Sequence, residues 1–343
     1  MSATLATVEE TLAGYARITG EAVETQLAAR ERSPYLSALL RDYPARGGKG
    51  MRPALLIATC RAFGGPTREA LGVAASLELL HNAFLIHDDF QDASRRRRGL
   101  PTLHELHGAP LAINAGDALA TLALEPLRDT TVLGGRVSRR VLDEVLATIV
   151  RTTEGQALEL GWRRDNVVDL GPADYLELVA KKTCCYSTVA PLRLGALIGS
   201  RATVPLRPLA RFGFHLGAAF QIRDDLLSVT GVDAVHGKDP LGDIREGKRT
   251  LMLLHLLGSA APRRRTWLVD FLGAPEAERT DADVDQVRDW MERHGSLEFA
   301  RGYGDRLAAA ADAAFADAFA DVPHSPHVEF VHALVPYMLE RTA

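Results

Sequence analysis

Hydrophobic residues recur every three to four positions along most of the chain, which is the spacing of amphipathic α-helices. Strand-like alternation is absent from nearly all of it. The pattern predicts two helices in 4–42, divided at Ser33-Pro34, and further helices at 54–63, 66–90, 111–124, 137–160, 174–198, 207–229, 250–257, 281–294, 297–320 and 327–341. Because there is neither an internal repeat nor a long linker, we expect one all-α domain over residues 1–343, a bundle with its polar motifs at helix ends around a common mouth.

The helix predicted at 66–90 delivers three carboxylates to one end, in the sequence DDFQD at 88–92. Asp88 and Asp92 are four residues apart, so a helix would place both side chains on one face within reach of a shared ion. Proteins usually hold Mg²⁺ with one or two carboxylates together with substrate phosphates. A solvent-exposed acidic helix end explains this motif alone equally well, but a second acidic pair, Asp224-Asp225, occurs far away in the sequence.

Basic residues accompany the acidic motifs. Only five of the 40 basic residues are lysines, and Lys49, Lys238 and Lys248 each follow a glycine in a polar loop. Lysine differs from arginine as a compact point charge, so we interpret these three positions as functional rather than random. The four arginines at 95–98 directly follow the first acidic motif. Guanidinium groups beside metal-binding carboxylates form a diphosphate-binding arrangement. The glycine-rich loop at 45–53 is either a second phosphate-binding loop or a plain interhelical connection.

Composition limits the other classes of function. A chain with 47% hydrophobic and 24% charged residues can bury a sizeable core, and its net charge of −4 gives no general attraction to nucleic acid or anionic lipid. Glu9 and Glu10 stand where a signal peptide would have positive charge, and no run approaches 18 apolar residues, so we predict a cytoplasmic protein without stable membrane insertion. The three cysteines lack disulfide or metal spacing and are interpreted as core residues.

In their order along the chain, these motifs resemble those of the trans-isoprenyl diphosphate synthases, or polyprenyl synthetases. The family's GGKxxRP matches residues 47–53, and its DDxxD and RRGxPT match 88–92 and 97–102. Further matches are Gly116-Asp117, Gly155-Gln156, Lys182-Thr183, Phe220-Gln221, Asp224-Asp225, Gly237-Lys238 and Gly247-Lys248. One departure is Ser228, which stands where the second motif commonly has its last aspartate. In such enzymes the first aspartate of that motif does most of the metal binding.

The resemblance implies a bundle of long helices around a deep apolar cavity, usually in a homodimer. The implied reaction is head-to-tail condensation of isopentenyl diphosphate with an allylic diphosphate (dimethylallyl, geranyl or farnesyl), with release of pyrophosphate. Ionisation of the allylic C–O bond places negative charge on the departing pyrophosphate. Metal ions and fixed cations that bind this charge more tightly than the ground state lower the barrier. The pyrophosphate can also take the proton, so no side chain need act as a strong base.

The resemblance also implies a role for each matching residue. Asp88, Asp92 and Asp224 would hold three Mg²⁺ around the allylic diphosphate, supported by Asp89 and Asp225. The allylic diphosphate would be contacted by Arg97, Lys182, Lys238 and, on closure, Lys248. Isopentenyl diphosphate would be bound without metal by Lys49, Arg52, His81 and Arg98. Neutral oxygens near the carbocation would come from Thr183 and Gln221.

Product length depends on side chains below the first motif. Phe84 lies four residues before Asp88, on the same helical face and about 6 Å lower, where its ring could form the floor of the cavity. Ala83 beside it is small, and family members that stop at C15 often have large side chains at one or both positions. We therefore expect a product of C15 to C20, with the C20 geranylgeranyl diphosphate preferred. Alternatively, Phe84 packs into the core and has no effect on product length.

Two other functions share part of these motifs. A class I terpene cyclase also uses DDxxD on a helical bundle, but it binds no second substrate, so the loop 47–52 and Arg98 would have no role. A non-catalytic subunit of a heteromeric synthase usually lacks an aspartate-rich motif, whereas the first motif is intact here. Both remain alternatives to the synthase.

Overall fold

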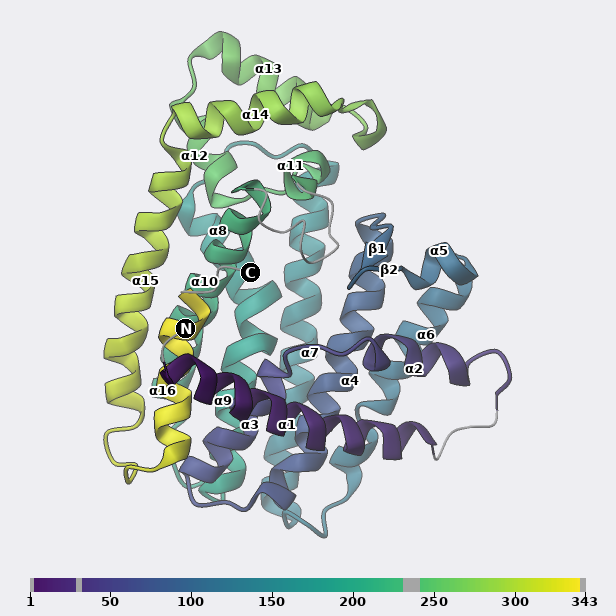
Figure 1. The fold of residues 1–343 in the computed structure, drawn as a ribbon, viewed down its shortest axis with the longest axis vertical. Helices are drawn as coiled ribbons and strands as arrows, with labels where there is room; N and C mark the ends of the chain where they lie inside the picture. The colour runs from purple at the N-terminus through teal and green to yellow at the C-terminus, as the bar shows by residue number, and fades with distance from the viewer. Residues whose placement is uncertain (1–2, 29–32, 231–240, 340–343) are drawn as a thin grey trace.

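The computed structural model describes residues 3–28, 33–230 and 241–339, and within them the chain is almost entirely helical, as predicted (Figure 1). The α-helices are α1 (Ala3–Ala28), α2 (Ser37–Ala45), α3 (Met51–Ala62), α4 (Thr67–Gln91), α5 (Leu103–His107), α6 (Ala109–Leu122), α7 (Gly135–Arg164), α8 (Pro172–Val179), α9 (Ala190–Gly199), α10 (Arg207–Thr230), α11 (Gly242–Glu246), α12 (Leu251–Ser259), α13 (Pro262–Gly273), α14 (Asp281–Arg293), α15 (Ser296–Ala318) and α16 (Pro326–Leu339). Short 3-10 turns are η1 (Glu125–Arg128) and η4 (Glu276–Glu278), and η2 (Ala180–Val189) is a π-helix.

Several elements were not predicted from the hydrophobic pattern, among them the short helix α5 and the 3-10 turns η1 and η4. Helix α13 was missed because its first turn is a run of arginines, and α11 lies in a segment predicted to be a loop. The segment after the first acidic motif contains a small antiparallel hairpin of β1 (Arg96–Arg97) and β2 (Leu100–Pro101). Its two loop residues, Arg98 and Gly99, have φ of 53° and 77°. Positive φ at both positions is what a tight two-residue hairpin requires.

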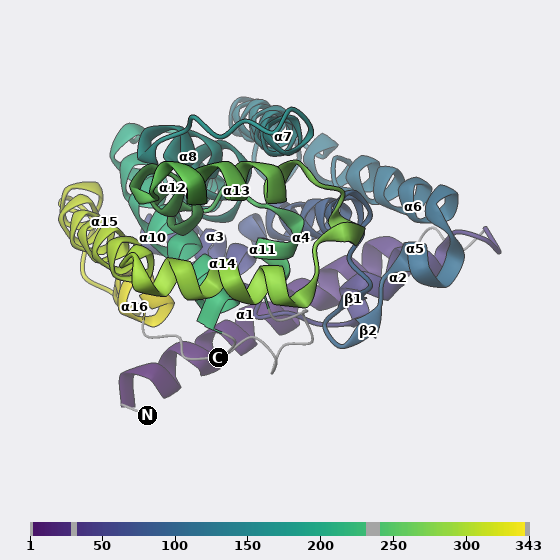
Figure 2. The same cartoon turned by 90° about the horizontal axis from the view of Figure 1, so that it is seen from above.

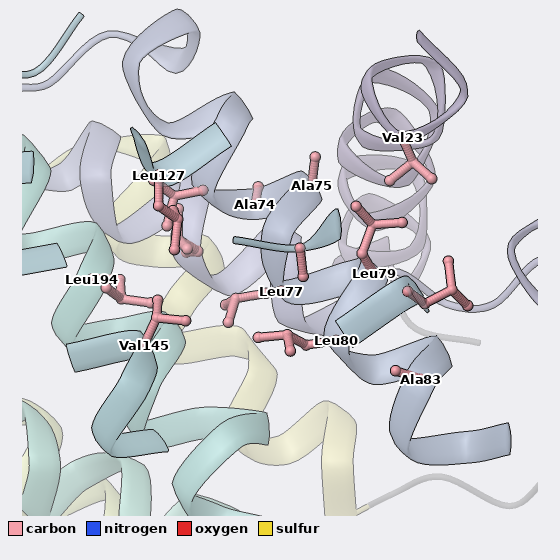
Figure 3. Close-up of a cluster of buried hydrophobic side chains, with 14 of the residues drawn as sticks. Val23, Ala74, Ala75, Leu77, Leu79, Leu80, Ala83, Leu127, Val145 and Leu194 are labelled. Atoms are coloured by element: carbon pink, nitrogen blue, oxygen red, sulfur yellow. The ribbon is translucent and has the colours of Figure 1, made fainter. Parts of the chain in front are cut away.

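Helix α4 lies at the centre of one hydrophobic core. Figure 3 shows Leu77 and Leu80 of α4 on the side that faces Leu194 of α9 and Val145 of α7, and all four are nearly inaccessible to solvent. The helix is long and apolar enough to cross a membrane, but 67% of its most apolar window is buried inside the bundle. Packing against neighbouring helices on several sides therefore accounts for its composition. This packing fixes the acidic end of α4 relative to α7 and α10.

The π-helix η2 crosses α7 and α10 at very short range. A Cβ atom on Gly155 of α7 would lie 2.7 Å from Lys182 Cα, and one on Gly217 of α10 would lie 2.9 Å from Cys184 Sγ. Only glycine permits this approach, which places the start of η2 between the two helices. π-Helical turns are rare and frequently occur at functional sites. Seen from above, α13 and α14 lie over the end of the bundle at which α4, α7 and α10 finish (Figure 2).

Candidate active site

A cavity of about 490 Å³ opens at this end of the bundle, with walls from α4, α7, η2, α10 and the segment around α11. Most of the predicted site residues meet in its wall: Arg52, His81, Phe84, Asp88, Arg97, Arg98, Lys182, Thr183, Gln221, Asp224, Asp225 and Lys248. Four predicted residues do not line it: Lys49 is exposed, and Ala83, Asp89 and Asp92 are buried beside it. Lys238 lies outside the described residues.

The first acidic motif has one carboxylate facing the cavity. Asp88 lies 3.4 Å from Lys182 Nζ and 3.6 Å from a guanidinium nitrogen of Arg97. Its neighbour Asp89 is inaccessible to solvent and accepts hydrogen bonds from the Tyr43 hydroxyl and from Arg97. Burial raises the pKa of Asp89, and the Arg97 charge opposes this rise. Asp89 thus ties α2 and the β-hairpin to α4, which is a supporting position rather than a direct contact with a ligand.

Asp92 contacts two cations. It directly follows Gln91, the last residue of α4, and its amide still donates to the Asp88 carbonyl at 2.8 Å, so it lies one helical turn beyond Asp88. Its Oδ1 accepts a hydrogen bond of 2.6 Å from Arg163, and its Oδ2 lies 3.2 Å from Lys248 Nζ. No sequence motif marks Arg163, because its contact with Asp92 arises only when the ends of α4 and α7 come together.

Two lysines of the cavity wall are surrounded by carboxylates. Lys182 contacts Glu159 of α7 as well as Asp88. Burial alone would lower the pKa of Lys182, but Asp88 and Glu159 outweigh burial and raise it. Lys248 lies within 3.2 Å of three carboxylates, those of Asp92, Asp243 and Glu246. Both ammonium groups therefore stay charged at neutral pH, as a site for an anionic substrate requires.

The second acidic motif is linked to neutral side chains. Thr183 Oγ1 donates to Gln221 Oε1 at 2.9 Å, and Gln221 Nε2 donates to Asp225 Oδ1 at 2.7 Å. The Tyr175 hydroxyl donates to the other oxygen of Asp225, also at 2.7 Å. Burial and, to a lesser extent, Asp243 raise the pKa of the Asp225 carboxyl to about 7, although these two hydrogen bonds oppose the rise. Asp224 faces the cavity directly.

A second cationic region lies beside α3. Arg52 donates to Tyr186 Oη at 3.0 Å and to Ser187 Oγ at 2.9 Å, and lies 3.2 Å from His81 Nε2. Burial, followed by Arg52 and Arg98, holds the pKa of His81 well below its ordinary value, so the imidazole is neutral. Two buried nitrogens here, Arg52 Nε and His81 Nδ1, have no hydrogen-bond partner among the described residues. Such unsatisfied donors fit a site that a ligand completes.

Glu78 is a residue of this region that sequence reasoning missed. Burial raises its pKa, while Arg52 and Arg98 act in the opposite direction. Glu78 thus interacts electrostatically with both arginines. It lies three residues before His81, one turn away on α4, so helical spacing from His81 could have revealed it.

Two aromatic rings in contact with each other also line the cavity. The ring of Phe84 meets that of Tyr186 edge to face, with centroids 5.5 Å apart, and Arg52 lies 4.5 Å above the Tyr186 ring. Tyr186, from η2, was not predicted because nothing in its local sequence indicates that it faces α4. Ala83 points into the core near Leu79 and Leu80 (Figure 3). Phe84 and Tyr186 both line the cavity, whereas Ala83 does not.

The donor atoms of the cavity fit magnesium. Within the described residues, no three His, Cys, Asp or Glu side chains converge on one point as a complete metal cage would require. Asp88 and Asp224 nonetheless present hard carboxylate oxygens to one cavity, next to cations suited to phosphate. Mg²⁺ is commonly held by one or two carboxylates and completes its octahedron with substrate phosphates and water. These carboxylates therefore suit a metal that is bound jointly with a diphosphate.

The fold and cavity define an all-helical enzyme of the class that binds diphosphates through metal ions and fixed cations. A family model described as polyprenyl synthetase matches residues 33–291. The chain belongs to the polyprenyl synthetase family, and the resemblance seen in its motifs is confirmed. Members of this family are magnesium-dependent prenyltransferases that use isoprenyl diphosphates, so the chain is an enzyme of this type.

Individual relatives agree with this assignment. The chain is 36% identical to the short chain isoprenyl diphosphate synthase of Methanothermobacter thermautotrophicus, over 74% of this chain and 75% of the relative. It superimposes on the geranylgeranyl pyrophosphate synthetase of Pyrococcus horikoshii with a TM-score of 0.85, 28% identity and 98% of each chain covered. The geranylgeranyl pyrophosphate synthase of Corynebacterium glutamicum, solved with isoprenyl diphosphate and magnesium, has a TM-score of 0.81, 28% identity and the same coverage.

Proposed function

We propose that this protein condenses isopentenyl diphosphate head-to-tail with an allylic diphosphate to form a short-chain diphosphate of C15 to C20, with C20 as the main product. The observation that carries the proposal is the pair of cationic regions in one cavity. Lys182 and Arg97 lie beside Asp88, whereas Arg52 and Arg98 line a separate region of the same wall. Two regions suit two diphosphates, and a class I terpene cyclase needs only one. The geranylgeranyl names of solved relatives support the C20 product.

The proposed roles of the residues follow from their contacts. Three Mg²⁺ ions would be held by Asp88, Asp92 and Asp224 together with the allylic diphosphate, where they would neutralise the charge of the departing pyrophosphate. Arg97, Lys182 and Lys248 would bind the same group as fixed cations, and we extend this role to Lys238 from the motif alone. Thr183 Oγ1 and the Gln221 amide are hydrogen-bonded to each other and would face the allylic carbocation.

Isopentenyl diphosphate would bind to the second region. Arg52 is positioned by Tyr186 and Ser187, which leaves its buried Nε available as a further donor. Arg98 approaches Gly48 of the glycine-rich loop, where a Cβ atom would lie 2.8 Å from its guanidinium. Lys49 lies in that loop and would reach the same diphosphate from outside the cavity wall. The neutral imidazole of His81 would accept or donate a hydrogen bond without adding charge.

We also propose that the chain is one domain that functions in the cytoplasm as a homodimer. Apolar side chains on two neighbouring segments support the dimer: Leu111 and Ile113 of α6 are each 38% exposed, and Leu146 and Val150 of α7 are 43% and 55% exposed. Exposed apolar groups that gather on one face often mark a protein–protein interface. Sedimentation velocity would test this proposal, because a Leu146→Glu, Val150→Glu variant should sediment as a monomer.

One assay separates the proposed synthase from the alternatives. The purified full chain is incubated with Mg²⁺, isopentenyl diphosphate and, in separate reactions, dimethylallyl, geranyl or farnesyl diphosphate, and the products are identified by mass spectrometry. We expect elongated diphosphates and released pyrophosphate. A cyclic hydrocarbon formed without isopentenyl diphosphate would identify a terpene cyclase. No product from any primer would support a non-catalytic subunit.

Product length provides a second test. If Phe84 is the cavity floor, Phe84→Ala should lengthen the main product by at least one C5 unit, because the tail can then grow past the position of the ring. Tyr186→Ala should act in the same direction, since the two rings are in contact. A folded Phe84→Ala variant with an unchanged product distribution by mass spectrometry would exclude this role and assign Phe84 to the core.

A further inference from the structure

The second acidic motif contains Ser228 at the position of its usual last aspartate, and the structure shows what this serine contacts. Ser228 Oγ donates a hydrogen bond of 2.6 Å to Asp243 Oδ2. The backbone is joined at the same point, because the Leu241 amide donates to the Ser228 carbonyl at 3.3 Å. Two hydrogen bonds therefore fix the start of α11 against the end of α10, although Asp243 is 15 residues further along the chain.

Asp243 belongs to the cavity wall, together with Asp224 and Asp225. Its Oδ1 lies 3.1 Å from Lys248 Nζ, and the same ammonium is 3.2 Å from Oδ2 of Asp92 in the first motif. Asp243 and Asp92 thus lie on either side of the Lys248 ammonium group. The last aspartate of a complete second motif would project a carboxylate into this same region from α10.

We infer that Asp243 supplies to the magnesium site the carboxylate that the second motif lacks, and that Ser228 positions it. This inference rests on the proposed function. The two side chains form a matched pair, because a hydroxyl at 228 donates to the Asp243 carboxylate, whereas an aspartate there would repel it. One oxygen of Asp243 is held by Ser228, and the other is directed towards Lys248 and the cavity.

Binding of inorganic pyrophosphate tests the inference without catalysis. Isothermal titration of pyrophosphate into the full chain is performed once with Mg²⁺ and once with EDTA. We expect Asp243→Asn to weaken binding by about tenfold or more in Mg²⁺, as for the loss of one charged contact, and to leave binding in EDTA unchanged or tighter. If Asp243 only balances the charge of Lys248, its loss would tighten binding similarly in both titrations, and that outcome would overturn the inference.

Exchanging the two side chains provides a sharper test. The double variant Ser228→Asp, Asp243→Asn moves the carboxylate to the α10 position and should recover most of the Mg²⁺-dependent affinity that Asp243→Asn loses. Ser228→Ala alone should lower this affinity by a smaller factor, because Asp243 then keeps its charge but loses its fixed position. Failure of the exchange to recover any affinity, in a variant with a wild-type circular dichroism spectrum and melting temperature, would contradict the inference.

Asp305→Asn is the matched control, since Asp305 is an exposed carboxylate on α15 outside the cavity. Its binding of pyrophosphate should equal that of the wild type. The experiment also separates this inference from the proposed function. A wild-type protein that binds pyrophosphate with Mg²⁺ through Asp243 but elongates no primer would refute the proposed reaction and leave the role of Asp243 intact.

Discussion

The two acidic motifs face the same cavity, but the partners of their carboxylates differ: cations in the first motif and neutral hydrogen-bond donors in the second. On α4, each carboxylate has a cationic neighbour: Asp88 has Lys182, Asp89 has Arg97, and Asp92 has Arg163. On α10, Asp225 accepts hydrogen bonds from the neutral donors Gln221 and Tyr175. Ser228 replaces a third carboxylate there.

This difference shows which acidic motif has counter-ions on the protein itself. The first motif carries its counter-ions on neighbouring side chains, so its geometry is set by ion pairs that form on folding. The second motif is held by hydrogen bonds that do not cancel its charge, and burial raises the pKa of Asp225 to about 7. At neutral pH the Asp225 carboxyl is therefore partly protonated, whereas each carboxylate of the first motif has a cation beside it.

The largest expected effect is on turnover. We predict that Asp88→Ala and Asp224→Ala each lower turnover by at least about 10²–10³-fold, because each removes a group that stabilises the charge of the departing pyrophosphate. Steady-state release of pyrophosphate measures the change, with Asp305→Asn as the control. Equal losses would show that the motifs act jointly despite their different surroundings. Near-normal turnover of Asp88→Ala would refute its assignment as a metal ligand.

Folding stability should reveal the contrast directly. Asp89→Asn breaks a buried ion pair and should destabilise the metal-free protein by about 3–5 kcal/mol. Asp225→Asn keeps neutral partners and should change the free energy of unfolding by less than about 1.5 kcal/mol. Urea unfolding at pH 7.5 measures both variants. Similar losses in the two would mean that the kind of partner does not distinguish the motifs.

A third effect concerns the cationic region beside α3, which lies outside both motifs. Arg98→Ala should raise the Michaelis constant for isopentenyl diphosphate more than tenfold, since a charge-assisted contact contributes about 1.5–3 kcal/mol, while the constant for the allylic primer changes little. Lys49→Ala should act in the same direction with a smaller effect, because Lys49 is exposed. If both Michaelis constants rise equally, the assignment of the two cationic regions to the two substrates is wrong.

The smallest expected effect is the contribution of His81 to the pH dependence of the free energy of unfolding. Burial keeps the pKa of His81 well below its ordinary value in the folded protein, so the folded state does not take up the proton that the unfolded chain binds below about pH 6.5. The native state should therefore lose up to about 1.4 kcal/mol per pH unit as the pH falls further. A His81→Gln variant should lack this contribution. Urea unfolding between pH 7.5 and 5 compares the slopes, and parallel slopes would contradict the prediction.

Local sequence determined most of the helices and most of the cavity wall. Helical periodicity depends on residues three and four apart, so long helices such as α4 and α10 were predicted within a few residues. The order of the short motifs identified the family and most residues that meet in the wall. Where local patterning was weak, the prediction failed: α13 begins with three arginines and was missed.

Tertiary structure alone decided which side chains meet between elements. Asp92 contacts Arg163 because α4 ends at Gln91 and α7 ends beside it, and Tyr186 meets Phe84 because η2 is π-helical and is held close to α7 at Gly155. Ser228 of α10 contacts Asp243 of α11, which is 15 residues further along the chain. Such contacts depend on how closely the helices approach and on where they end. Packing over the whole bundle determines both, and no local sequence pattern encodes them.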